Sequence, residues 1–237
     1  MNTNKTYYAD DRLNDCCAYC GDFAETEDHV PSRCFLDKPY PQNMPVVPCC
    51  SKCNHGFSFD EEYVSCFIDC MKENTAEPNI IRRKKTCDSF LHSPKLQERI
   101  ASQIKEFGGL TIYDYEKNRF ERVIYKLAYG HLAYENSSLN WDSEHETNMW
   151  FLETMPKTLL EEFDKPYVGG DIVPEIGSNC FSKNGGFHIY VGLSEHFCCC
   201  DWIIVQEGRY RYCVSPDSTK VKLVIAEYLA AEVSITR

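Results

Sequence analysis

The sequence lacks the features of a membrane-bound or exported protein. No apolar run approaches the ~20 residues that a helix needs to cross a bilayer. The first 15 residues are polar and acidic, without the basic and apolar regions of a signal peptide. Internal repeats, low-complexity segments, a glycine-rich phosphate loop and a nucleophilic serine or cysteine triad are also missing. These absences predict a globular, cytoplasmic chain with a loose leader over residues 1–15.

Positive charge is scarce as well. The net charge of −11 argues against a simple nucleic-acid-binding protein. Its distribution is uneven, because residues 79–126 carry 11 basic and 6 acidic groups while the segments on both sides are acidic. The basic segment begins with the expected nucleic-acid-binding residues, Arg82, Arg83, Lys84 and Lys85. A solvated charged face is the alternative interpretation of this run.

Cysteine, in contrast, is plentiful, with 15 residues. In a cytoplasmic chain this number indicates reduced thiols and a bound metal rather than disulfides. Two cysteine doublets leave the register open, and only the second cysteine of each gives the Cys-x-x-Cys spacing of a zinc knuckle. Four thiolates at this spacing predict a structural zinc with no open coordination position. The expected ligands are Cys17, Cys20, Cys50 and Cys53.

The segment around these cysteines is expected to fold as a small module over residues 16–78. Thr26 to Val30 can form a strand, and residues 32–42 a loop. A second strand is expected from Met44 to Val47, and a helix from about Ser51. The predicted order is therefore strand, loop, strand, helix.

The remainder, residues 79–237, is expected to form an accessory α+β domain that recognises a substrate or a partner. Apolar periodicity predicts helices over residues 95–107, 120–134 and 157–163. The stretch 110–115 is expected to be a strand and 141–155 to be irregular. Strands of a C-terminal antiparallel sheet are expected at residues 187–191, 202–206, 209–214 and 221–226. The overall class is α+β, a small zinc module followed by a larger domain.

An Asp-His pair lies between the two cysteine pairs, and an asparagine follows the last cysteine. Asp28 and His29 are neighbours on the expected strand, so their side chains point to opposite faces and can serve different partners. A neutral imidazole can activate a water molecule. Asp28 and Asn54 offer hard oxygen ligands, which suit Mg²⁺ or Mn²⁺. This combination predicts the hydrolysis of a phosphodiester bond.

The pattern CxxCG, EDHVP, N and PxCxxCN, over about residues 16–63, resembles the zinc-stapled form of the HNH endonucleases, the ββα-metal nucleases. The resemblance implies that His29 is the general base and that Asp28 and Asn54 bind the catalytic cation. It also implies that Asn43 holds the histidine and the loop in place, and that the four cysteines bind a structural zinc. DNA is the implied substrate, with RNA as the alternative. A role in defence against foreign DNA follows by analogy.

The sequence departs from the family pattern in two places. No lysine or arginine follows Asn54 in the run HGFSFDEE, so phosphate contact would come from elsewhere, such as the segment at Arg82. The spacing from Asn43 to Asn54 is also longer than in the commonest form, and His55 is an alternative ligand to Asn54. The competing interpretation is a non-catalytic zinc module that binds nucleic acid or protein. A second copy of the chain or a regulatory protein are further candidate partners.

Three weaker groups each have a functional and a structural interpretation. The acidic run from Asp60 to Glu62 either binds a second cation or forms an acidic first helical turn. His131 and Glu135, one helical turn apart, either bind a metal or flank a packed helix. The arginines and tyrosines of residues 209–212 either stack nucleic-acid bases or alternate on a half-exposed strand.

Overall fold

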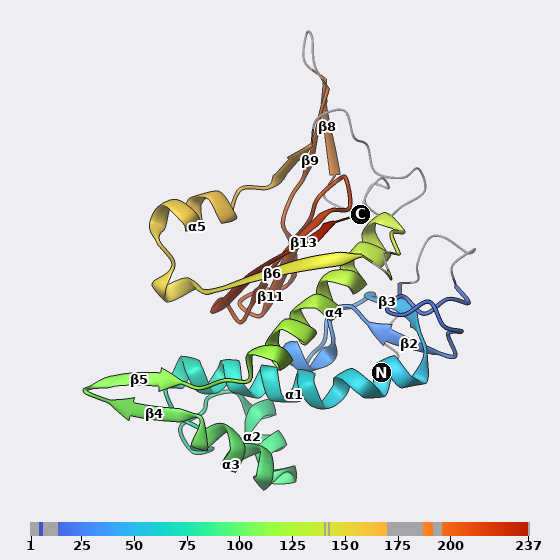
Figure 1. The fold of residues 1–237 in the computed structure, drawn as a ribbon. Coiled ribbons are helices and arrows are strands. Elements are labelled where there is room, and N and C mark those ends of the chain that lie inside the picture. The colour runs from blue at the N-terminus through green and yellow to red at the C-terminus, as the bar shows by residue number, and fades with distance from the viewer. Residues whose placement is uncertain are drawn as a thin grey trace. The chain divides into compact units, whose positions relative to one another are not determined.

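The computed structural model confirms the α+β class (Figure 1). It describes residues 5–6, 14–139, 141, 143–169, 187–191 and 196–236. Among the helices in these ranges, none combines the length and the apolar composition that crossing a membrane requires.

The chain forms two compact units. Unit 1 comprises Met1–Gly56 and Ile124–Arg237, and unit 2 comprises Phe57–Val123. Helices α1 (Ser51–Glu73) and α4 (Lys117–Asn136) continue from one unit into the other. This division differs from the domain boundaries expected after residues 15 and 78. The reason is that the chain returns, from Ile124 onward, to the unit that holds the cysteine pairs.

A small sheet and the start of α1 form the N-terminal part of unit 1. Strands β2 (Thr26–His29) and β3 (Met44–Cys49) pair in antiparallel fashion, and β1 (Lys5–Thr6) runs parallel to β3 on its other side. A short 3-10 turn, Arg33–Phe35, lies in the connection between β2 and β3. Because α1 begins at Ser51, directly after β3, the predicted order of strand, loop, strand and helix is confirmed.

A five-stranded antiparallel sheet forms the C-terminal part of unit 1, which confirms the expected antiparallel sheet except that the strand at residues 187–191 belongs to a separate sheet. Its strands lie in the order β10-β11-β12-β13-β6. Their bounds are β6 (Glu144–Phe151), β10 (Ile203–Gln206), β11 (Tyr210–Val214), β12 (Lys220–Ile225) and β13 (Leu229–Thr236). A separate three-stranded sheet has the order β7-β9-β8. Its strands are β7 (Tyr167–Gly169), β8 (Phe187–Val191) and β9 (His196–Cys200).

Each face of the five-stranded sheet is covered by a helix. On one face, the buried rings of Tyr210 and Tyr212 contact His131 of α4. On the other face, helix α5 (Lys157–Phe163) packs its Phe163 in a cluster with Val224. Alternate residues of the same strands thus form two different apolar layers.

The second half of α4 is buried on all sides within unit 1. Its residues from Lys126 to Asn136 are buried without exception, which is typical of a helix between two layers. Gly130 makes this position possible, since a Cβ there would lie 2.9 Å from Cγ2 of Val30 and 3.1 Å from the hydroxyl of Tyr19. A larger side chain would push α4 away from the cysteine module.

Unit 2 combines short helices with a hairpin around an aromatic core. Its elements after α1 are α2 (Lys84–His92), α3 (Pro94–Ser102), β4 (Ile104–Phe107) and β5 (Leu110–Tyr113). Tyr63 and Phe67 of α1 pack edge-on against Phe120. These T-shaped contacts suit the opposite charges of a ring's face and edge.

Two predictions of secondary structure were wrong. The helix expected over residues 95–107 ends at Ser102, and its last part forms the first strand of the β4–β5 hairpin. Gly108 and Gly109 are the turn of that hairpin rather than a helix stop, and both have positive φ, as a tight two-residue turn requires. The stretch expected to be irregular, residues 141–155, contains the eight-residue strand β6.

Candidate metal centre

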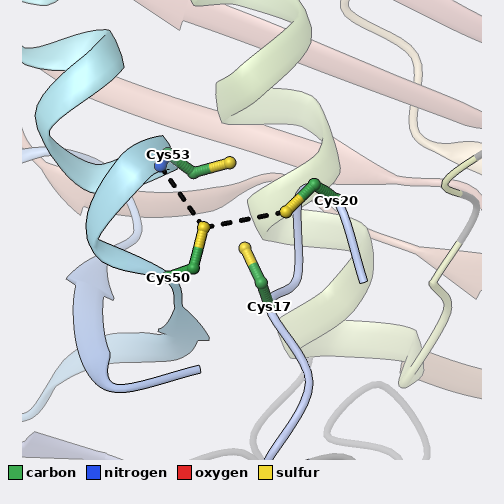
Figure 2. A group of neighbouring side chains, drawn as sticks. All are labelled: Cys17, Cys20, Cys50 and Cys53. Atoms are coloured by element: carbon green, nitrogen blue, oxygen red, sulfur yellow. Dashed lines mark hydrogen bonds between the residues drawn. The ribbon is translucent and has the colours of Figure 1, made fainter. Parts of the chain in front are cut away.

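The four cysteines expected to bind zinc lie together in unit 1 (Figure 2). Their sulfur atoms all lie within 4.8 Å of one another, and Sγ of Cys20 is 3.7 Å from Sγ of Cys50. Four sulfurs at about 2.3 Å from a tetrahedral ion would be about 3.8 Å apart. The group can therefore hold a metal ion such as zinc, and the predicted register of both pairs is confirmed. The described ranges contain no other group of three or more His, Cys, Asp or Glu ligands gathered this closely.

A backbone N–H group donates a hydrogen bond at each cysteine pair. At the end of β3 the chain enters α1, so that Cys50 precedes the helix and Cys53 lies in its first turn. The amide of Cys53 donates a hydrogen bond to Sγ of Cys50, at 3.4 Å. In the other pair, the amide of Gly21 donates to the carbonyl of Cys17, at 3.0 Å. The Cys53 N–H stabilises negative charge on the Cys50 sulfur, while the Gly21 N–H closes the turn of the first pair.

Gly21 is needed at this knuckle for two reasons. Its φ of +77° lies in the left-handed region, which costs a residue without a side chain the least. The indole of Trp141 also lies against it, and a Cβ would approach that ring to 3.0 Å. Nε1 of Trp141 donates a hydrogen bond to the carbonyl of Cys17, at 3.0 Å. The tryptophan thus lies against the loop of the first cysteine pair and holds it through Cys17.

The thiols of the group differ in their acidity. A hydrogen bond from the Cys49 thiol lowers the pKa of Cys17 to about 4. Desolvation raises the pKa of Cys20 to about 11, although Cys20 is the most exposed of the four residues, and it also raises the pKa of Cys53. Without a metal, the surroundings therefore favour the thiolate of Cys17 and disfavour those of Cys20 and Cys53. A bound divalent cation would remove this penalty, because it stabilises the deprotonated form of its ligands.

Asp28 lies close to this group but already has a cation of the chain as its partner. Its side chain is largely buried on β2. Oδ2 of Asp28 lies 2.5 Å from Nζ of Lys126 and accepts a hydrogen bond from the Tyr19 hydroxyl at 2.7 Å. Lys126 is buried and also donates to Oγ of Ser32, at 2.7 Å. While Lys126 holds this position, the carboxylate does not fit the role of ligand for an added divalent cation.

The two other residues expected in catalysis lie at opposite ends of the β2–β3 hairpin loop. His29 is the last residue of β2, half-buried, and lies opposite Val46 of β3. Asn43 is exposed and precedes β3 with a φ of 57°. Asparagine tolerates this left-handed conformation better than most residues, so the backbone conformation alone explains an asparagine at this position.

Asn54 connects α1 to β2. Its Nδ2 donates to Oγ1 of Thr26 at 3.1 Å and to the carbonyl of Glu27 at 3.4 Å. The side chain therefore fastens the first turn of α1 beside the residues that precede Asp28. His55, the alternative ligand, is exposed, and its Nδ1 lies 2.7 Å from the carbonyl of Ser51 within the same helix.

The expected nucleic-acid-binding run does not form one uniform surface. Arg82 is exposed and lies 3.3 Å from Glu73, and Lys84 is exposed as well. Arg83, in contrast, is only 8% exposed in its side chain and pairs with Asp69 at 3.0 Å inside unit 2. Its guanidinium is used in holding α2 against α1. Arg82, Lys84 and the half-buried Lys85 remain as the candidates for phosphate contact.

The acidic run and the His-Glu pair have structural roles. Asp60 accepts from Nε of Arg119 at 2.5 Å and from Nη1 of Arg122 at 2.6 Å. It lies well inside α1, so the interpretation of the run as an acidic first helical turn was wrong. His131 stacks on Tyr212, whose hydroxyl donates to Glu135. Burial holds the pKa of His131 well below its ordinary value and raises the pKa of Glu135 to about 7.

Two residues of this site escaped the sequence analysis. Lys126 is a charged residue among the apolar positions of α4, and such a residue signals a buried partner without identifying it. Trp141 stands alone in a polar stretch, where nothing local indicates what the indole covers. Both contacts join segments that are far apart in the sequence.

Comparisons of the chain with protein-family models, with curated proteins and with solved structures find no match. The chemistry of the site therefore has to be inferred from its residues and from their geometry. What these establish is a four-cysteine group, suited to a metal such as zinc, at the junction of β3 and α1.

Proposed function

We propose that the N-terminal part of unit 1 is a zinc-stapled endonuclease module of the HNH type, which hydrolyses phosphodiester bonds in DNA. The proposal rests on the contacts that connect α1 to β2. The cysteine group closes one end of this junction, and Asn54 binds β2 directly before Asp28 and His29. The cysteine group and Asn54 thus hold the hairpin and the start of α1 beside the proposed catalytic histidine.

Zinc in this proposal has a structural role. Four thiolates would fill its coordination shell and leave no open position. The metal would then join the hairpin to the start of α1, in addition to the packing of Val30 and Val47 against α4. We place the protein in the cytoplasm, where thiols stay reduced and available to a metal.

His29 is the proposed general base. As a neutral imidazole it accepts a proton from the water that attacks phosphorus. A divalent cation, when bound, would neutralise charge on the phosphate. A dependence on Mg²⁺ or Mn²⁺ through Asp28 requires that the ion displace Lys126 from this carboxylate.

A plasmid-cleavage assay of the full, zinc-loaded chain tests the proposal. The assay compares Mg²⁺, Mn²⁺ and a buffer with EDTA added just before the DNA. His29→Ala should lower cleavage by about 100-fold or more, the usual effect of losing a general base. His92→Ala is the matched control, since this exposed histidine lies on α2, outside the proposed catalytic module. Equal cleavage by both variants, or none by the parent in any metal, contradicts the proposal.

A second function is favoured by the Lys126–Asp28 ion pair. A carboxylate neutralised by a buried ammonium is well suited to a structural role. The module would then be a non-catalytic zinc unit that binds nucleic acid or protein. In this case DNA is retained in a gel-shift assay without being cut, and His29→Ala changes neither result.

The proposed DNA contacts are the exposed basic residues near the start of α2. Replacing Arg82, Lys84 and Lys85 with glutamate should weaken binding and flatten its salt dependence, because fewer counterions are released. Arg83 is left unchanged in this variant, since its buried pair with Asp69 supports the fold. Unchanged affinity would move the binding surface to another part of the chain.

A further inference from the structure

A cavity of about 590 Å³ lies on the face of the five-stranded sheet that α5 covers. Its size falls within the range of small-molecule sites. The rings of Trp150, Phe163 and Tyr167 form apolar walls, and they come from β6, α5 and β7. Strands β12 and β13 form the floor. The cavity belongs entirely to unit 1 and is separate from the cysteine group.

Lys222 is the unusual residue of this cavity. It lies on β12 and is 6% exposed. Its Nζ is 4.3 Å from the ring centroid of Tyr167 and 5.7 Å from that of Phe163. It donates one hydrogen bond, to the carbonyl of Lys165 at 3.0 Å. No carboxylate of the described residues lies within ion-pair distance of this amine, unlike that of Lys126.

Burial lowers the pKa of Lys222 from its ordinary value. Three neighbouring groups, Glu232, Cys213 and Glu162, oppose this shift, while Lys220 supports it. Glu232 is the cross-strand neighbour of Lys222, but its carboxylate accepts a hydrogen bond from Tyr167 at 3.0 Å. A larger share of the amine is therefore neutral than in an exposed lysine.

The charges at the rim favour an anion. Lys165 pairs with Glu162 at 2.6 Å, and Glu232 is engaged by Tyr167. Lys220, two residues before Lys222 and on the same face of β12, is exposed and lines the cavity without a carboxylate partner in the described ranges. A ligand with a flat apolar body and one anionic group would match both the rings and Lys220.

We propose that this cavity binds a planar carbonyl compound that carries an anionic group, and that Lys222 forms an imine with it. The amine nitrogen attacks the carbonyl carbon and a C–N bond forms. The carbonyl oxygen leaves as water with the two protons of the neutral amine, and no electrons are transferred. Desolvated lysines in apolar pockets are suited to this chemistry because their neutral form is nucleophilic.

Pyridoxal 5′-phosphate is a suitable probe, because it joins an aldehyde, a flat ring and a phosphate. The full chain is incubated with the probe, reduced with borohydride and mapped by peptide mass spectrometry. Lys222 should be labelled at least about tenfold faster than the exposed Lys84 and Lys95. Labelling should saturate with probe concentration, and pyridoxine 5′-phosphate, which lacks the aldehyde, should protect Lys222.

Two comparisons isolate the parts of the proposal. Pyridoxal without its phosphate should label Lys222 more slowly, and Lys220→Met should remove that difference. Labelling of Lys222 no faster than that of Lys84, or labelling that neither saturates nor is protected, overturns the proposal. The mapping uses the unmodified chain, so its result does not depend on whether a Lys222 variant folds.

Discussion

Two polar groups of unit 1 differ in what neutralises their negative charge. The four cysteines gather sulfur atoms that become anionic as ligands of a metal. Asp28, in contrast, carries its own counterion in Lys126 and a further donor in Tyr19. The first group needs a cation from outside, and the second is complete without one. A metal is therefore expected where the chain supplies only anions.

The comparison also bears on the proposed nuclease. An Asp-His pair beside a zinc knuckle indicates a cation site when read in the sequence alone. In the folded chain, α4 brings an ammonium to the aspartate from almost 100 residues away. The predictions below test this difference between the two groups, in order of decreasing expected effect.

Removing one thiol should have the largest effect. Cys17→Ser deletes a ligand and should lower the metal content well below one zinc per chain, because a three-thiolate site binds zinc more weakly. It should also unfold the module, since structural zinc contributes about 10–16 kcal/mol in small zinc domains. Metal analysis and far-UV circular dichroism measure both effects.

Cys16→Ser is the matched control for this prediction. Cys16 is the preceding residue of the doublet and lies outside the group of four. The zinc content of this variant should stay near one per chain. Loss of zinc from Cys16→Ser, with retention in Cys17→Ser, would reverse the assigned register.

The second largest effect is expected from removing the internal cation, Lys126. Lys126→Met should lower the free energy of unfolding by about 3–5 kcal/mol, because the carboxylate of Asp28 would remain buried without its partner. The double variant Lys126→Met with Asp28→Asn should recover much of this loss, since both charges are gone. Urea unfolding of the four forms gives the coupling energy. If the losses in unfolding free energy of the two single variants simply add, Lys126 and Asp28 do not stabilise the fold as a pair.

At Glu135, a third buried acidic group, a bound proton neutralises the charge. Its pKa rises from the ordinary 4.5 to about 7, chiefly through burial. The folded chain thus binds this proton more tightly than the unfolded chain. The resulting stability is fully present below about pH 4.5 and is lost as the pH rises through about 7, by about 3 kcal/mol in total.

Glu135→Gln should remove that part of the pH dependence. Unfolding measured in urea at several pH values between 4.5 and 8 compares it with Glu98→Gln, which changes an exposed glutamate. The first variant should flatten the profile, and the second should follow the parent chain. Two identical profiles would mean that Glu135 is ionised in the folded state.

Asn54→Ala should have the smallest effect, about 1 kcal/mol, because two hydrogen bonds from one half-buried amide are lost. Lys52→Ala, at an exposed position near the start of the same helix, is the control. If Asn54 acts instead as a cation ligand, its removal should change the Mg²⁺ or Mn²⁺ dependence of cleavage while leaving the urea midpoint where it was.

Local signals in the sequence were enough for the metal group and its supports. Cys-x-x-Cys spacing selected the four sulfurs, and strand and helix patterns predicted β2, β3 and the start of α1. The same is true of α5, whose bounds of Lys157 and Phe163 were predicted from periodicity. These features depend on residues within one or two turns of each other.

The helix expected over residues 95–107 failed at a local hairpin, whereas the other failures came from pairings between distant segments. Strand β6 is polar because it lies at the edge of its sheet with mostly exposed residues at its start, so it lacks the alternation of a half-buried strand. Its partner, β13, lies about 80 residues later in the chain. The Lys126–Asp28 ion pair was likewise invisible, since neither residue indicates the other by spacing.

The indole that lies against the loop of the first cysteine pair has an optical consequence. The chain has three tryptophans, and Trp150 and Trp202 both lie in the apolar layer around α5. Trp141 alone lies against Gly21 and bonds the carbonyl of Cys17. With the other two replaced by phenylalanine, the emission of this single fluorophore would report the state of the knuckle. Zinc uptake and release would then be visible in real time, without an added dye.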